Sequence, residues 1–171
     1  MRDTAAEGAL DARLEAQVQA RTKANREFFA RESERLARLC HAMAERFARG
    51  GRLIASGRSP TARSDARHVA VEFVHPVIVG KRALPAIGLA AEGGSLPSQI
   101  ELLVRPDDIV IAFGAGSDAD DAASVVQAAR VRGCLTIALA RVGADWEFEP
   151  PTGDRYIAQE LVELMPETRP G

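Results

Sequence analysis

The chain has 171 residues, of which 46% are hydrophobic and 27% are charged, and its 22 basic side chains nearly balance its 24 acidic ones. Since one domain usually takes roughly 100 to 200 residues, we expect a single domain over residues 1–171. The balanced charge excludes a disordered chain. With 5% aromatic residues and an isoelectric point near 6.0, the composition also argues against direct binding of nucleic acid.

No stretch of the sequence has the pattern of a membrane or targeting segment. No run of 18 apolar residues occurs, and the start, MRDTAAEGALDAR, lacks the basic and apolar regions of a signal peptide. We therefore expect a cytoplasmic protein that does not enter a membrane. Cys40 and Cys134 lie far apart and form no CxxC pair, which predicts two buried free thiols.

The first fifty residues have the pattern of helices, which we expect over residues 7–49. Apolar residues recur at steps of three and four from Phe28 to Phe47, and Gly50 and Gly51 are suited to end the helix. The preceding stretch, residues 7–22, is predicted as a weaker helix rich in alanine. Together these apolar surfaces exceed what one small sheet needs as cover, so we expect a homodimer or homotetramer.

After the glycines, residues 52–165 alternate short apolar runs with helical segments. Such an alternation favours a parallel sheet with helices on both faces. Ser59 and Pro60 are suited to the N-cap and first position of the helix after the first strand. The expected strands are 52–56, 86–90, 108–113, 134–140 and 146–149, and the expected helices are 60–73, 96–104, 119–132 and 154–165.

Two loops stand out as places for chemistry. They are GRSPTARSDARHVAVEF, residues 57–73, and AFGAGSDADDAASVVQAAR, residues 112–130. Each follows an expected strand and leads into an expected helix. In open parallel sheets ligands bind beyond the carboxyl ends of the strands, where helix N-termini favour anions. We therefore expect any binding site between these two loops.

At these residues the chain resembles the sugar isomerase (SIS) domain family, and within it the phosphoheptose isomerase branch. DARHVAVE, residues 65–72, matches the end of the family's first motif, and DIVIAF with the helix ending QAARVRG matches the second. Further landmarks extend the resemblance over about residues 25–165. The resemblance and the strand–helix alternation together predict a three-layer, doubly wound (flavodoxin-like) parallel five-stranded sheet with a long N-terminal helix.

The resemblance also implies a site. Glu72 matches the catalytic glutamate, a general base that moves a proton between adjacent sugar carbons. His68, Glu72 and Gln159 match positions at which some members hold a metal, so zinc is the cofactor to test for. By the same resemblance a sugar phosphate would be held by a set of polar residues in and after the two loops: Ser59, Thr61, Arg63, Asp65 and Ser117. Taken alone, a His/Glu pair four residues apart is also typical of a pair that only stabilises its helix.

Both loops depart from the family pattern. Small residues without hydroxyls occupy residues 114–116 and Ala119, where the family has serine or threonine, and Asp118, Asp120 and Asp121 follow. These carboxylates suit a helix N-terminus but repel a phosphate dianion. In the first loop, Arg58 and Arg63 either hold an anion or pair with these aspartates across the crevice. We expect such pairing, in one subunit or between two.

The last helix lacks a further group that the resemblance implies. The family's second catalytic residue, a histidine eight positions after the matching glutamine, corresponds to Glu167, just past Pro166. The sequence therefore predicts a protein with weak or lost catalysis that acts as a sugar-phosphate-binding, regulatory or partner module. The alternative is an active sugar-phosphate isomerase with Glu72 as its general base.

Overall fold

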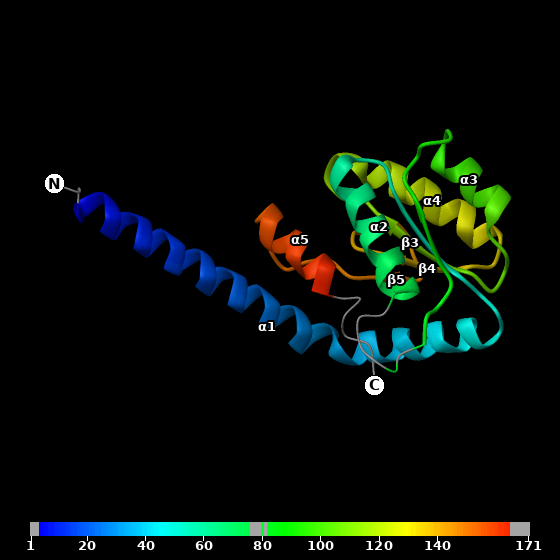
Figure 1. The fold of residues 1–171 in the computed structure, drawn as a ribbon, viewed down its shortest axis with the longest axis horizontal. Coiled ribbons are helices and arrows are strands. Elements are labelled where there is room, and N and C mark those ends of the chain that lie inside the picture. The colour runs from blue at the N-terminus through cyan, green and yellow to red at the C-terminus, as the bar shows by residue number, and fades with distance from the viewer. Residues whose placement is uncertain (1–3, 76–79, 81, 165–171) are drawn as a thin grey trace.

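The computed structural model describes residues 4–75, 80 and 82–164, and its centre is a five-stranded parallel sheet (Figure 1). The strands are β1 (Leu53–Gly57), β2 (Ala86–Leu89), β3 (Ile109–Phe113), β4 (Leu135–Ala138) and β5 (Trp146–Glu147), in the spatial order β2-β1-β3-β4-β5. Every pair of neighbouring strands is parallel. The predicted doubly wound fold is confirmed, with strand ends within a few residues of those expected.

Helices cover both faces of the sheet and make three layers. They are α1 (Thr4–Ala48), α2 (Pro60–Val74), α3 (Leu96–Leu103), α4 (Ala119–Val131) and α5 (Arg155–Leu164), with a short 3-10 turn η1 (Gly116–Asp118) before α4. Alternate strand residues face opposite layers: Leu53 and Ala55 pack with α1, α2 and α5, whereas Ile54 packs with α3 and α4. The sheet is therefore buried on both sides, which explains its continuous apolar strands.

The two helices expected over residues 7–49 are one continuous helix, α1. No glycine or proline occurs between Gly8 and Gly50, so nothing in the sequence interrupts the backbone hydrogen bonds. Gly50 ends the helix in a left-handed conformation, with φ of 86°. Phe28, Leu36 and Leu39 on one face of the helix are buried in the core.

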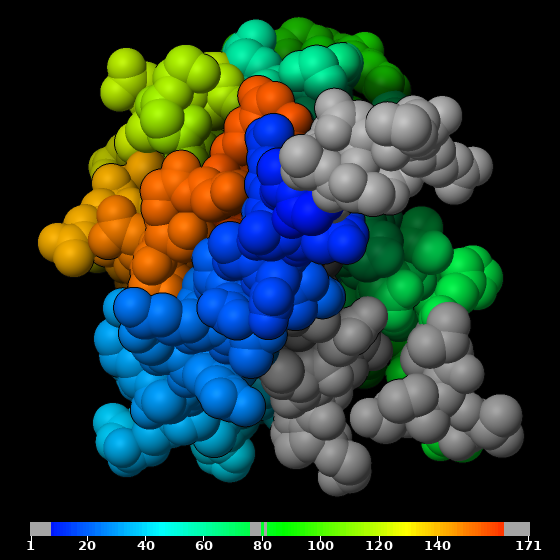
Figure 2. Space-filling model, turned by 90° about the vertical axis from the view of Figure 1, so that its left-hand side faces the viewer, coloured from blue at the N-terminus to red at the C-terminus, as the bar shows by residue number. Residues whose placement is uncertain are grey.

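The N-terminal half of α1 extends beyond the rest of the molecule as an arm, residues 8–23 (Figure 1). All side chains of this arm are exposed, and Leu10, Leu14 and Val18 form an apolar row along it. At its base Arg21 Nε donates to Glu160 Oε1 of α5 at 2.6 Å. Figure 2 looks along the arm and shows α5 against α1. None of the described helices is long and apolar enough to cross a membrane.

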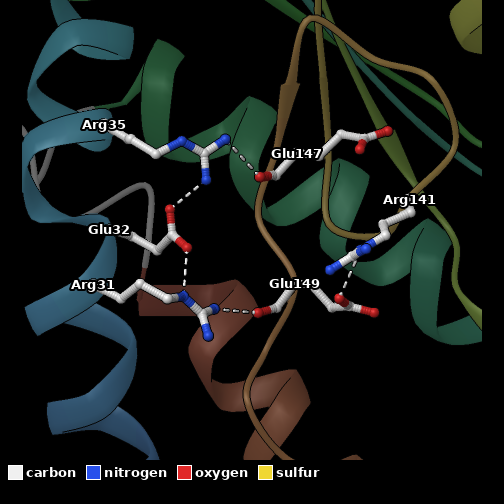
Figure 3. A network of polar contacts seen from close by, with 6 residues as sticks. All are labelled: Arg31, Glu32, Arg35, Arg141, Glu147 and Glu149. Carbon is white, nitrogen blue, oxygen red and sulfur yellow. Dashed lines mark hydrogen bonds and ion pairs between the residues drawn. The ribbon is translucent and has the colours of Figure 1, made fainter.

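A buried carboxylate ties α1 to the chain around β5 (Figure 3). Glu32 of α1 is buried and accepts hydrogen bonds from Arg31 at 2.7 Å and from Arg35 at 2.5 Å. The same two guanidinium groups donate to the main-chain carbonyls of Glu149 and Glu147, at 2.9 and 3.0 Å. Because a buried carboxylate is stable only when paired, this network fixes the position of the segment that leads into α5.

The side chain of Glu147 continues this network on the other side of β5. Its Oε1 accepts hydrogen bonds from the backbone N–H groups of Val142, Gly143 and Ala144, at 2.6 to 3.1 Å. Partial burial would raise the pKa of Glu147, but these three hydrogen bonds outweigh burial and lower it. The turn between β4 and β5 is therefore held closed by a carboxylate from its own chain.

Candidate functional site

The two loops singled out in the sequence lie side by side at the carboxyl edge of the sheet. β1 and β3 are neighbours, and the last residue of β1, Gly57, is in register with Phe113, the last of β3. The turn after β1 is tight, because a Cβ on Gly57 would lie 2.2 Å from the carbonyl oxygen of Ala62. Glycine at this position lets α2 begin directly against the strand end.

A serine hydroxyl of the first loop caps the N-terminus of α2. Ser59 is the N-cap, and its Oγ accepts a hydrogen bond from the backbone N–H of Ala62 at 3.4 Å, with Pro60 at the first helical position. This confirms the cap predicted from the sequence. Thr61 follows in the first turn and is exposed. The chemistry that Ser59 and Thr61 can offer is therefore hydrogen bonding at a helix N-terminus.

The second loop is narrow and has few polar side chains of its own. Gly114 lies so close to η1 that a Cβ would come within 2.8 Å of the carbonyl oxygen of Asp118. Gly116 has a φ of 59°, which favours glycine. Ser117 is exposed, and Asp118 makes no side-chain hydrogen bond as the N-cap of α4. In this conformation the loop has no room for a larger residue at position 114.

An ion pair joins the two loops. Arg58 Nε lies 2.9 Å from Asp121 Oδ2, and the two side chains are 46% and 40% exposed. The predicted pairing across the crevice is confirmed for Arg58. Within the described part of this single chain, Arg63 forms no ion pair with Asp118, Asp120 or Asp121, and its pairing between two subunits stays a prediction. The rotation of α2 turns Arg63 toward the helix's outer face instead, where it lines a groove with His68.

Asp65, the remaining predicted substrate-binding residue, is a buried residue of α2 that faces α5. Its Oδ1 accepts a hydrogen bond from Gln159 Nε2. The motif residues Asp65 and Gln159 are thus brought together although they are 94 positions apart. Sequence reasoning named both residues but missed their contact, since spacing along the chain carries no information on how α5 lies against α2.

Glu72 and His68 lie one turn apart on α2; Glu72 is partly exposed and His68 is exposed. Gln159, the third predicted zinc ligand, donates a hydrogen bond from its amide nitrogen to Asp65. Among the described residues no three His, Cys, Asp or Glu side chains are grouped so that they could hold a metal ion. The predicted zinc set of His68, Glu72 and Gln159 includes a glutamine amide, lies outside the groups so defined, and stays a prediction. Residue 167, the position of the second catalytic group, lies outside the described residues.

Neither cysteine forms a disulfide, as predicted, but the predicted burial is confirmed only for Cys134, since Cys40 is partly exposed. Burial raises the pKa of Cys134 to about 11, and its Sγ donates to the carbonyl oxygen of Arg105 at 3.3 Å. A thiol with so high a pKa is protonated at neutral pH and is a poor nucleophile. Cys134 therefore contributes packing and not chemistry.

Comparison with known proteins identifies the relatives of this chain. It is 28% identical over 136 residues to the phosphoheptose isomerase of Solidesulfovibrio magneticus, and the aligned region covers 72% of this chain and 66% of that protein. It is 30% identical over 123 residues to the phosphoheptose isomerase of Desulfovibrio desulfuricans, covering 64% and 58%. The chain is a homologue of phosphoheptose isomerases. It matches less than two thirds of the length of these relatives, and no protein-family model matches it.

The fold of this isomerase homologue agrees with solved structures. A phosphoheptose isomerase from Francisella tularensis superposes with a TM-score of 0.80 at 21% identity, covering 93% of this chain and 94% of that one. A phosphoheptose isomerase from Neisseria gonorrhoeae gives 0.79 at 18% identity, covering 94% and 96%. This likeness shows the fold, a parallel sheet with a long N-terminal helix, as the sequence predicted.

Proposed function

We propose that this SIS-domain protein has weak or no isomerase activity and that its crevice is closed by its own charges. The observation that carries the proposal is the Arg58–Asp121 ion pair between the two loops. Arg58 is the arginine of the first loop that lies at the crevice, and its guanidinium is already occupied by a carboxylate. The protein then serves as a regulatory or partner module, and sugar phosphate is at most a weak ligand.

The second loop supports this proposal through its shape and charge. Gly114 and Gly116 supply no hydroxyl to a phosphate, and the close approach of Asp118 leaves no space for a side chain at 114. Asp118, Asp120 and Asp121 stand at the start of α4, where a phosphate dianion would have to lie. Two unit charges about 4 Å apart in a protein surface environment repel by about 4 kcal/mol, which no single neutral hydrogen bond offsets.

The alternative is an active sugar-phosphate isomerase in which Glu72 is the general base. The contact between Gln159 and Asp65 favours it, because this contact fixes α5 against the helix that carries Glu72. In this case Glu72 would take a proton from one sugar carbon and return it to the next. The substrate phosphate would rest on Ser59, Thr61 and Ser117, since Arg63 lines the groove with His68, and the acid partner would come from outside the described residues.

Turnover of sedoheptulose 7-phosphate separates the two functions. We expect the protein to turn over far more slowly than about 1 per second, which lies at the low end of ordinary enzymes. Turnover near that rate that is abolished in Glu72→Gln would overturn the first proposal and establish the alternative. Unchanged slow turnover in Glu72→Gln would exclude Glu72 as a base.

A second experiment tests the closed crevice directly. Replacing Asp118, Asp120 and Asp121 together by serine removes the repulsion and frees Arg58. We expect the variant to gain thermal stability from millimolar phosphate, because a ligand that binds only the folded state stabilises it. The parent protein should show no comparable gain. Glu34→Ser, Glu45→Ser and Asp107→Ser combined in one variant removes three exposed carboxylates elsewhere and serves as the control. An equal gain in parent and variant would contradict the closure.

We also propose that the protein associates with itself through the arm of α1. The apolar row of Leu10, Leu14 and Val18 is 51–58% exposed. A short helix without a packing partner is only marginally stable in water, so contact with a second chain would stabilise the arm. Replacing these three residues by glutamine should dissociate the oligomer in light scattering. A parent protein that scatters as a single 18.3 kDa chain at micromolar concentration would refute self-association.

A further inference from the structure

A second groove lies in the layer of α3 and α4, on the side of the sheet away from α1 (Figure 1). It has a volume of about 720 Å³ and follows the outer face of α4, between α3 and the loop after β4. The exposed face of α4 forms most of its lining, with Ala123, Ser124, Gln127 and Val131. The groove shares no residue with the arm or with the crevice pair, so it is a separate surface.

Large apolar side chains are exposed at this groove. Val131 follows Gln127 by one helical turn and is 74% exposed. Leu102, next to the lining residue Glu101 of α3, is 90% exposed. Exposed apolar side chains beside a hollow are typical of a surface that contacts another protein, because association removes them from water.

The two ends of the α4 face carry opposite charges. Asp120 lies one turn before Ser124 at the start of the helix, and Arg132 directly follows its end. Both are exposed, and in the described part of the chain neither forms an ion pair or a side-chain hydrogen bond. Glu101 also lines the groove but forms no ion pair with Arg132. Asp120 and Val131 are eleven residues apart, about three turns or 16 Å, so they share one face of the helix.

A face that is acidic at one end and basic at the other complements a second copy of itself in one orientation. We propose that this groove is an interface between two copies of the chain, in which the two α4 helices pack antiparallel about a two-fold axis. The axis passes midway between Ser124 and Gln127. Asp120 of each copy then meets the end of the other helix that carries Val131 and Arg132. A parallel arrangement would instead place like charges together, which disfavours association.

The antiparallel arrangement also satisfies the middle of the face. Ser124 of one copy lies opposite Gln127 of the other, so the glutamine amide can donate to the serine oxygen. Val131 of one copy lies over the small side chain of Ala123 in the other. This interface does not depend on association through the arm, because the two surfaces lie on opposite sides of the sheet. If both form, two different two-fold contacts close a tetramer.

The test uses the full chain with Leu10, Leu14 and Val18 replaced by glutamine, which removes association through the arm. We expect this arm variant to sediment as a dimer at micromolar concentration. Adding Asp120→Arg should raise the dimer dissociation constant by about tenfold or more, because arginines then meet at both ends of the interface. Adding Arg132→Asp as well should restore the dimer. A monomeric arm variant, or a dimer that Asp120→Arg leaves unchanged, would overturn the proposal.

Mixing two variants tests the orientation of the helices. Asp120→Arg and Arg132→Asp, each in the arm variant, should be monomeric alone and form a heterodimer when mixed, because opposite charges then meet at both ends. Native mass spectrometry separates the heterodimer from either homodimer. Two folded variants that form no heterodimer would overturn the antiparallel arrangement.

Two further variants separate the interface from folding and from net charge. Val131→Gln changes an exposed helical residue without changing charge, and it should weaken the dimer of the arm variant severalfold. Glu92→Arg reverses an exposed carboxylate on the other side of the sheet and should leave the dimer unchanged. Equal weakening by Glu92→Arg and Asp120→Arg would mean that association responds only to net charge, and the groove would not be the interface.

Discussion

The amino edge and the carboxyl edge of the sheet use the same pair of groups, arginine and aspartate, in different ways. At the amino edge Asp108 is 1% exposed and accepts hydrogen bonds from Arg52 and from the backbone N–H of Arg105, which ties β1 to β3. At the carboxyl edge Arg58 and Asp121 are about half exposed and connect only two loops. Water can replace the partners of an exposed pair but not of a buried one. One pair therefore builds the fold, and the other stays available for function.

The largest effect is expected from Asp108→Ala. Removing one partner of a buried pair leaves Arg52 without its counter-ion, and the free energy of unfolding should fall by about 3–5 kcal/mol. Urea denaturation measures this loss. Asp107→Ala is the matched control, since Asp107 pairs with Arg49 at 2.7 Å but both side chains are about half exposed. A loss of less than about 1 kcal/mol is expected there. Equal losses would erase the contrast between buried and exposed pairs.

The same carboxylate should make stability depend on acid pH. Burial would raise the pKa of Asp108, but its hydrogen bonds from Arg52 and Arg105 outweigh burial and lower it. The stabilisation by Asp108 is therefore fully present above the unfolded pKa, about 3.9, and is lost as pH falls through the lower folded pKa. The difference in unfolding free energy between the parent and Asp108→Ala should shrink below about pH 4. A difference that stays constant down to pH 2 would contradict the lowered pKa.

A smaller loss is expected at the carboxyl edge from close packing. Gly57→Ala would place its Cβ 2.2 Å from the carbonyl oxygen of Ala62, so the loop must shift. We expect a loss of about 1–3 kcal/mol in urea denaturation. Gly153→Ala, with no atom within 4 Å of the added carbon, is the control and should be nearly neutral. If Gly57→Ala left the free energy of unfolding unchanged, the loop would shift to accommodate the added carbon at little cost, contrary to this prediction.

The smallest effect belongs to the exposed pair itself. Asp121→Asn should change the free energy of unfolding by less than about 1 kcal/mol, because water screens the pair. Thermal unfolding at low and high salt checks this value, and Asp120→Asn at the next position provides the comparison. A loss above about 2 kcal/mol would mean that the crevice pair belongs to the fold as much as Asp108 does.

The sequence predicted the elements of the core well because their patterns are local. Each strand is a short apolar run, and Ser59 with Pro60 marks the start of α2 through a cap that involves only neighbouring residues. It was less evident from the sequence that α1 is one continuous helix. The apolar pattern weakens over residues 7–22, yet continuity depends on the absence of a helix breaker rather than on that pattern.

The sequence predicted the opposite charges of the two loops but not which arginine pairs with which aspartate. Opposite charges on two loops of neighbouring strands predicted a pair across the crevice, and Arg58 with Asp121 forms it. The choice between Arg58 and Arg63 could not be made from composition. Successive helical residues turn by about 100°, so Arg63 in α2 faces the outer groove while Arg58, just before the helix, stays at the crevice.

The sequence by itself determined the order of strands and helices, the parallel sheet and the residue types around the crevice, since these depend on apolar periodicity, caps and charge. Only the tertiary structure decided that Gln159 binds Asp65, that Glu32 holds the segment of β5, and that Arg63 and His68 share a groove. These contacts join residues whose distance in space depends on how whole helices pack. Packing is fixed by the summed burial of many side chains, and no short stretch of sequence contains that sum.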